Sequence, residues 1–96
     1  MAKVKLTSIG MTCDVDERVV SDWRFLDLMT TAQDPDKNDA EKFWATNKGL
    51  KMMLGAEQKA KLIDKIAKNN DGYATVETVL DVLGELATKL GSSKKK

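Results

Sequence analysis

The feature that most constrains the fold is a stripe of apolar side chains at helical spacing near the end of the chain. Residues three and four apart lie on the same side of a helix. A helix of this kind has to bury its stripe against other elements of the same domain. Seven residues make up the stripe: Val76, Val79, Leu80, Leu83, Leu86, Ala87 and Leu90.

An earlier segment, which ends near Ala32, predicts a helix that is apolar on two sides. It is expected to begin near Asp14 or Asp16, because Asp14 and Glu17 have the spacing of a capping box. We expect one face to pack in the core with Trp23 as its anchor. The opposite face is expected to be covered either by the rest of the domain or by a partner. The core face holds Val19, Trp23, Leu26 and Met29, and the opposite face holds Phe25, Leu28 and Ala32.

The middle of the chain predicts two more helices, separated by a glycine. The second helix is expected to follow an Asp-Pro cap at residues 34–35, because proline suits the first helical position. Residues 47–49 (Asn-Lys-Gly) form a candidate break within it. Gly55 stands where a helix end favours a left-handed conformation, and the third helix is expected over residues 56–67.

Alternation of apolar and polar residues at 3–15, on both sides of Gly10, predicts a β-hairpin. The sequence therefore predicts a mainly α, four-helix single domain over residues 1–91 with this small N-terminal β-hairpin. Residues 92–96 (Ser-Ser-Lys-Lys-Lys) predict a disordered basic tail.

Composition argues against several classes of protein. There is no histidine, which removes the usual general base and the commonest metal ligand. Cys13 is the single cysteine, so no internal disulfide is expected and no histidine is present to activate its thiol. The net charge of +1 gives no field for nucleic acid or anionic membranes. No signal peptide or membrane span is expected, nor is an enzyme or a cofactor.

The run Asn69–Tyr73 looks like the middle of a calcium-binding EF-hand loop, but its register argues against that function. With Gly72 at loop position six, positions one and twelve are Ala67 and Thr78. An EF-hand needs a carboxylate at the first position and a bidentate glutamate at the last. We therefore expect a turn and no metal site.

A helix-turn-helix motif built from the last two helices is also disfavoured. A recognition helix needs polar or basic side chains at its start to contact bases and phosphates. Here the last helix opens with Val76-Glu77-Thr78-Val79 and continues with Asp81 and Glu85. Such a face would repel phosphate, so no nucleic-acid partner is expected.

Three further motifs, in this order, are typical of one family of proteins. The first is Asp22-Trp23-Arg24-Phe25 in an acidic helix, the second is Leu54-Gly55-Ala56-Glu57-Gln58, and the third is an Asp71-Gly72 turn before a last amphipathic helix. The stretch 15–90 resembles the tail assembly chaperones of siphophages, in the short form of that family.

The resemblance implies a non-enzymatic protein that binds the tape measure protein, keeps it soluble and helps recruit tail tube protein. It also implies a location in the host cell cytoplasm and absence from the mature virion. Many members have a longer form made by translational frameshifting, and the terminal Lys94-Lys95-Lys96 is compatible with a slippery site. The alternatives are a small helical head–tail connector or completion protein, and a small nucleic-acid-binding regulator.

A protein that holds a helical client needs exposed apolar side chains on a soluble body. Phe25 and Leu28 on the second face of the first helix meet this need, as do Trp44 and Met52 in the middle segments. Methionine is common on surfaces that accept variable partners. We therefore predict Phe25, Leu28, Trp44 and Met52 as partner-binding residues, with either the tape measure protein or a second copy of this chain as partner.

Overall fold

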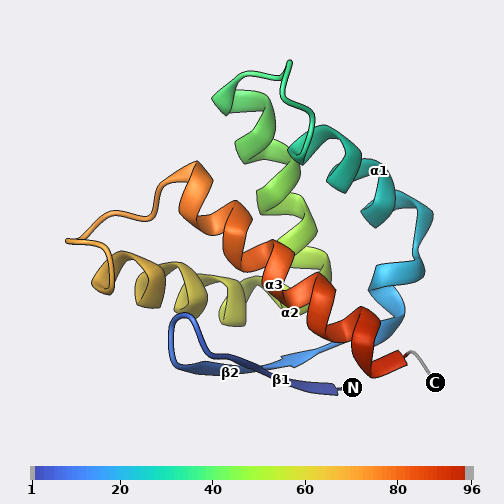
Figure 1. Cartoon of the computed structure of the whole chain (residues 1–96), viewed down its shortest axis with the longest axis horizontal. Helices are drawn as coiled ribbons and strands as arrows, with labels where there is room; N and C mark the ends of the chain where they lie inside the picture. Colours follow the sequence, from blue (N-terminus) through green and yellow to red (C-terminus); the bar gives the residue numbers. More distant parts are fainter. Residues whose placement is uncertain (1, 95–96) are drawn as a thin grey trace.

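A computed structural model of the chain describes residues 2–94 and the side chains of residues 2–90. The fold is mainly helical and begins with a two-stranded hairpin (Figure 1). In Figure 1 the hairpin lies at the lower edge, α1 lies at the upper right, and α3 crosses in front of α2. The elements in chain order are β1 (Ala2–Leu6), β2 (Met11–Val15), the 3-10 helix η1 (Glu17–Ser21), α1 (Trp23–Ala32), α2 (Asp39–Lys68) and α3 (Val76–Lys94).

The hairpin is confirmed, and one of its faces joins the core. β1 and β2 pair antiparallel, with Val4 opposite Cys13. The alternation of side chains across a strand places the apolar ones on one face, and Val4, Leu6, Cys13 and Val15 are all buried. A lone hairpin is marginal in water, so this contact with the helices is what makes it stable.

Polar contacts fix the hairpin turn to the helices. The Glu85 carboxylate of α3 accepts hydrogen bonds from the Ser8 hydroxyl and from the Thr7 backbone N–H. The Ser8 hydrogen bond is the main reason that the pKa of Glu85 lies below its ordinary value. At the end of α2, Asn69 Nδ2 donates to the Ile9 carbonyl at 3.3 Å. The hairpin is therefore connected to α2 and α3 by hydrogen bonds as well as by apolar contact.

Gly55 bends α2 and explains part of the Leu-Gly-x-Glu-Gln motif. Its φ of 80° and ψ of 166° interrupt the helical dihedral angles, a conformation that glycine adopts without a Cβ clash. The side chain of Gln58 reaches the strand, accepting from Asp14 N at 2.8 Å and donating to Asp14 O at 2.7 Å. Beside the bend, Met53 O accepts from Asp16 N at 3.3 Å. The motif thus ties the kinked helix to the end of β2.

Gly49 lets α1 approach α2 closely. It is buried inside α2, so the break predicted at residues 47–49 is wrong. A Cβ placed on Gly49 would lie 2.8 Å from Met29 Cε and 3.5 Å from Phe25 Cε1. A side chain at Gly49 would require the Met29 methyl to shift, so the role of this glycine is close packing against α1 rather than helix termination.

The helix count differs from the prediction. The predicted second and third helices are the two halves of α2, joined at Gly55, so the structure has three α-helices rather than four over residues 2–94. The predicted Asp-Pro start is also wrong, because α2 is capped by Asn38. Its Oδ1 accepts from Glu41 N at 2.9 Å, and Glu41 Oε1 accepts from Asn38 N at 3.3 Å. Asp34 instead accepts from Asp36 N in the preceding turn.

Four of the seven predicted stripe residues of α3 are buried, Val76, Leu80 and Ala87 are half-buried, and Val82, which was not assigned to the stripe, is also buried. Val79, Leu83, Leu86 and Leu90 are buried against α2 and the hairpin. Thr75 caps the helix, its hydroxyl accepting from Thr78 N at 3.2 Å. α3 extends to Lys94, past the predicted end at Gly91 and into the segment predicted as a tail. Residues 95 and 96 of that segment lie outside the described residues.

Candidate functional site

For three residues of α1, Trp23, Phe25 and Leu26, burial is the reverse of the prediction, whereas Met29 packs against the core as predicted. Trp23, the predicted core anchor, is 84% exposed, and Leu26 is 48% exposed. Phe25 is only 2% exposed and lies in the core, so its prediction as a partner-binding residue is wrong. Ala32 is also buried, and Met29 packs partly against the same core. The predicted core face therefore leaves two large apolar side chains in water.

The start of α1 explains this reversal. The first helix was predicted to begin near Asp14 or Asp16, but Asp16 caps the short η1 and Asp22 caps α1. This change of helix type between Val19 and Trp23 breaks the spacing on which the predicted face depended. Val19 belongs to η1 and is buried. Trp23 is the first residue of a new helix and is exposed.

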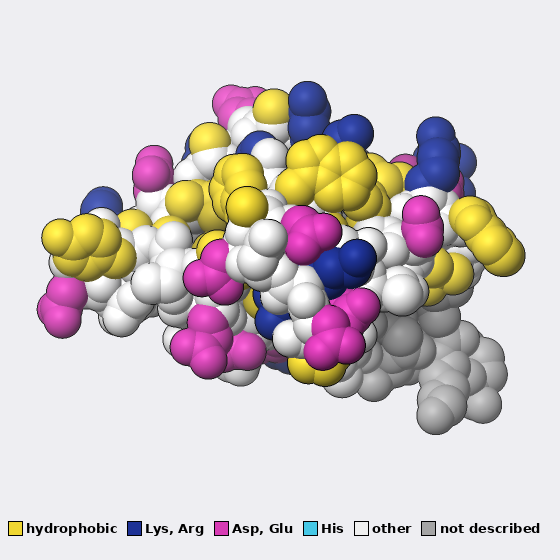
Figure 2. Space-filling model, turned by 90° about the horizontal axis from the view of Figure 1, so that it is seen from above, with side chains coloured by type: hydrophobic (Ala, Val, Ile, Leu, Met, Phe, Trp, Pro, Cys, Tyr) yellow, Lys and Arg dark blue, Asp and Glu magenta, His cyan; other side chains and the backbone are white. Residues whose placement is uncertain are grey.

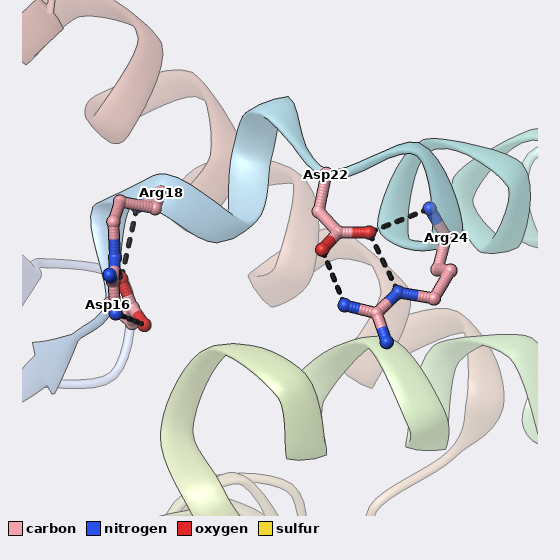
Figure 3. Close-up of polar contacts among 4 residues, drawn as sticks. All are labelled: Asp16, Arg18, Asp22 and Arg24. Atoms are coloured by element: carbon pink, nitrogen blue, oxygen red, sulfur yellow. Dashed lines mark hydrogen bonds and ion pairs between the residues drawn. The ribbon is translucent and has the colours of Figure 1, made fainter.

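Two similar ion pairs hold this region (Figure 3). Arg18 Nη2 lies 2.9 Å from Asp16 Oδ2, and Arg24 Nη2 lies 2.7 Å from Asp22 Oδ2. Each aspartate also accepts from the backbone N–H of its arginine, at 3.1 Å for Arg18 and 2.8 Å for Arg24. Hydrogen bonds from the Arg24 side chain are the main reason that the pKa of Asp22 is lowered to about 2. Trp23 therefore stands between two residues whose side chains are paired with each other.

A groove between α1 and α2 collects three of the four predicted partner-binding residues. Leu28 of α1 and Trp44 and Met52 of α2 line it, together with the exposed Trp23. Its volume is about 550 Å³. Pockets of this size lined by a few large apolar side chains are typical of binding sites. Phe25, by contrast, packs beneath the groove in the core.

Charged side chains complete the wall of this groove, which we call the tryptophan groove. Arg24, Lys48 and Lys51 line it against one acidic side chain, Asp27. Lys48 Nζ lies 5.1 Å from the centre of the Trp44 ring, within the range of a cation–π contact. The groove is thus apolar at its tryptophans and mainly basic at its charged positions.

Figure 2 looks onto the end of the molecule that carries α1 and the start of α2. Hydrophobic side chains are exposed across this face, with basic and acidic side chains between them. Of the large apolar residues that remain exposed, Trp23 and Trp44 line the tryptophan groove, whereas Phe43 and Leu26 do not. Large exposed apolar side chains that gather on one face mark an interaction surface more often than isolated ones do.

The described residues show no arrangement typical of catalysis. Residues 2–90 contain no group of three or more side chains that could hold a metal ion. Cys13 is buried in the hairpin, and its burial, followed by the charge of Asp14, raises the pKa of its thiol. A buried thiol of raised pKa is a poor nucleophile. Among the described helices, none has a stretch of length and apolarity sufficient to span a bilayer.

Sequence reasoning missed Trp23, Lys48 and Lys51 as members of the site. Trp23 was assigned to the core by its spacing from Val19, although the Asp-x-Arg repeat at residues 16–18 and 22–24 marks two separate caps. The two lysines follow Trp44 at intervals of four and seven, which places them on the same side of α2. That spacing could have predicted that Lys48 and Lys51 lie beside Trp44 in the site.

Comparison of the chain with protein-family models, with curated proteins and with solved structures finds no match. The function therefore has to be argued from the tryptophan groove and from the motifs of the sequence.

Proposed function

We propose that this chain is a non-enzymatic binding protein, a phage tail assembly chaperone that binds the tape measure protein in the tryptophan groove. One observation carries the proposal: Trp23, Leu28, Trp44 and Met52 come together in one exposed groove. The resemblance of residues 15–90 to tail assembly chaperones supports the identity of the client. The predominantly helical fold is compatible with this proposal.

The groove suits an amphipathic helix as its occupant. Recognition by a groove between two helices uses apolar residues spaced along one face of the bound helix. Tryptophan is among the residues that contribute most to binding when a partner covers it. Trp23 is 84% exposed and Trp44 is 53% exposed, so each has apolar area to lose on binding. Burying that area would supply the main driving force.

The charges of the groove narrow the chemistry of the client segment. Lys48 and Lys51 line the groove from α2 and Asp27 lines it from α1, while Arg24 is already paired with Asp22. We expect the client helix to carry acidic residues beside its apolar ones. Electrostatic complementarity of this kind raises association rates and selects against basic partners.

The remaining partners belong to the same proposal. A chaperone of this class would help to recruit tail tube protein, would act in the host cell cytoplasm and would be absent from the mature virion. Its partners would include a frameshifted longer form. A second copy of this chain is the other candidate for the groove, because two copies could cover each other's tryptophans.

Co-expression with a tape measure protein, which the proposal predicts to be encoded beside this chain, tests the proposal. The double variant Trp23→Ala with Trp44→Ala should fold, because both side chains are largely exposed, and should fail to keep the client soluble. Leu26→Ala is the matched control, since Leu26 is 48% exposed on α1 but does not line the groove. Circular dichroism establishes folding, and the soluble fraction of the client is the readout. If the double variant protects the client as well as the natural chain does, the groove is not the binding site.

A further inference from the structure

The tryptophan groove continues at both ends into a neighbouring hollow. At the η1 end, Met52 also lines a hollow of about 480 Å³, together with Val19. At the opposite end, Trp44 also lines a hollow of about 410 Å³, together with Thr31 and Ala40. Because neighbouring hollows share lining residues, the three form one continuous depression along the contact between α1 and α2. We call it the extended groove.

A single row of side chains on α2 forms one wall of the extended groove. Four residues at intervals of four make up the row: Ala40, Trp44, Lys48 and Met52. Side chains at this interval lie one above the other on a helix. The row ends before the interruption at Gly55, so it follows one uninterrupted stretch of helix. At a rise of about 1.5 Å per residue, its roughly twelve residues span about 18 Å.

α1 supplies the opposite wall with the same spacing. Trp23, Asp27 and Thr31 line the extended groove at intervals of four. A groove between rows of this kind accepts the corresponding row of side chains on another helix. The extended groove therefore suits a helix that lies along it for about twelve residues, which is three to four turns.

The charged side chains at the two ends of the extended groove are paired with each other. The Asp–Arg ion pairs of residues 16–18 and 22–24 line the hollow at the η1 end (Figure 3). Lys37 Nζ lies 3.8 Å from Glu41 Oε2 at the opposite end. Paired side chains present little net charge to a partner, so neither end selects a charged residue on a bound helix.

The middle of the extended groove carries unpaired charges that differ between its walls. Lys48 and Lys51 line the α2 wall, and neither forms an ion pair with a residue that the structure describes. Asp27 lines the α1 wall and is likewise without an ion pair among the described residues. A helix in the groove meets positive charge on its α2 side and negative charge on its α1 side. Complementarity therefore favours carboxylates on the edge of the helix that faces α2.

We propose that the extended groove binds one amphipathic helix of about twelve residues or more, lying along α1 and α2. Its apolar side chains contact Trp23 and Trp44, and carboxylates on one edge of its middle turns pair with Lys48 and Lys51. This inference rests on the proposed function, because it defines the length and the charge pattern of the segment that the tryptophan groove would bind.

Two designed helical peptides of roughly sixteen residues test the charge pattern. Both carry leucines three and four residues apart to form one apolar stripe. One has two glutamates along one edge of the stripe in its middle turns, and the other has lysines at those positions. Isothermal titration calorimetry should show about tenfold tighter binding of the acidic peptide, since two exposed attractions replace two repulsions. Lys48→Glu with Lys51→Glu should reverse the preference, and it should fold because both lysines are exposed.

A matched variant controls for net charge. Lys61→Glu with Lys65→Glu changes the net charge by the same amount on the second half of α2. Both of these lysines are exposed, and neither lines the extended groove. This variant should keep the preference of the natural chain for the acidic peptide.

Amide chemical shifts measured by NMR test the length of the bound segment. The acidic peptide should perturb amides throughout residues 23–31 of α1 and 40–52 of α2, and should leave residues 56–68 unchanged. A footprint confined to one end of the extended groove would mean that the helix crosses the two walls instead of lying along them, and the proposal would be wrong.

The remaining outcomes separate this inference from the proposed function. The inference is overturned if neither peptide binds, if the two bind equally, or if Lys48→Glu with Lys51→Glu still prefers the acidic one. The function is tested by the solubility of the tape measure protein. If the charge-reversed variant protects that client fully while Trp23→Ala with Trp44→Ala does not, the function stands and the charge pattern is wrong. If the natural chain prefers the acidic peptide but leaves the tape measure protein insoluble, the inference stands and the choice of client is wrong.

Discussion

α1 and α3 are both amphipathic helices, yet they bury their apolar residues by different rules. α3 has one apolar stripe, and its central residues Leu83 and Leu86 are almost fully buried. α1 has two apolar faces: the structure buries Phe25 on one, and on the other it exposes Trp23 and Leu26 and packs only Met29 against the core. A single stripe specifies its own orientation, whereas a helix apolar on both sides takes its orientation from the surface it packs on.

That surface is α2 at Gly49. The Met29 methyl occupies the space that a Cβ would fill at this position, and Phe25 lies in contact beside it. Trp23 and Leu26, on the other face of α1, are exposed to solvent and are free to contact a partner. α3 therefore contributes only to the core. α1 contributes to the core and also to the proposed binding site, because its exposed residue Trp23 lines the tryptophan groove.

The largest expected effect tests the orientation of α1. Phe25→Ala should destabilise the fold by about 3–5 kcal/mol, as removal of a buried aromatic ring does. Leu26→Ala, one residue further along the same helix, should change the free energy of unfolding by no more than about 0.5 kcal/mol. Urea titration of both variants measures the contrast. Equal losses at the two positions would mean that α1 does not sit on α2 by its Phe25 face.

The corresponding test of α3 is Leu83→Ala. Leu83 is 1% exposed at the middle of the stripe, so its truncation should cost about 2–5 kcal/mol. Thr88→Ala is the control on the exposed side of the same helix and should be close to neutral. A loss below about 1 kcal/mol for Leu83→Ala in a urea titration would show that the α3 stripe is not the core contact.

Local signals predicted much of the fold. The hairpin followed from alternation around Gly10 and α3 from its stripe, and the helix end predicted at Gly55 is where the helical backbone of α2 is interrupted. What could not be predicted depends on contacts distant in sequence. Gly49 resembles a helix breaker in the sequence, and only the approach of α1 shows that it is a packing position.

The candidate site was predicted in part for the same reason. Leu28, Trp44 and Met52 were selected as exposed apolar residues, and they line one groove. Phe25 was selected with them because it shares a helical face with Leu28, but it turns into the core. Trp23 was missed because one continuous helix was assumed from Asp14 or Asp16, although Asp22 caps a second helix that begins at Trp23.

A smaller effect tests the packing role of Gly49 against a glycine of α3. Gly84 lies inside α3 with nothing within 4 Å of an added Cβ, so Gly84→Ala should stabilise the protein by about 1 kcal/mol through helix propensity. Gly49→Ala gains the same propensity but places its Cβ 2.8 Å from Met29 Cε. It should therefore gain clearly less than Gly84→Ala or destabilise the protein. Equal gains in urea titrations would show that α1 does not depend on the missing side chain.

The smallest effect concerns the cap that opens α1, the helix whose orientation differs from the prediction. The pKa of Asp22 is lowered to about 2 from an ordinary value of 3.8, so its carboxylate favours the fold above pH 3.8. That contribution disappears as the pH falls through about 2. Asp22→Asn keeps a good capping residue but has no charge to titrate. The natural chain should be the more stable of the two at neutral pH, and the difference should shrink between pH 3.8 and about 2.

Arg24 is the cause of this pH dependence, so a change at Arg24 serves as the control. Its guanidinium makes the hydrogen bonds that lower the pKa of Asp22 most, so Arg24→Gln should return that pKa toward 3.8 in an NMR titration of the carboxyl group. The effect on stability should be small and weaken at high salt, because the side chain of Arg24 is 79% exposed. If the natural chain and Asp22→Asn differ in stability by the same amount at pH 7 and at about pH 2, the charge of Asp22 does not stabilise the fold. In that event the ion pair of Figure 3 would not contribute to fixing the start of α1, and Trp23 would owe its position to the packing of Phe25 and Met29 at Gly49 alone.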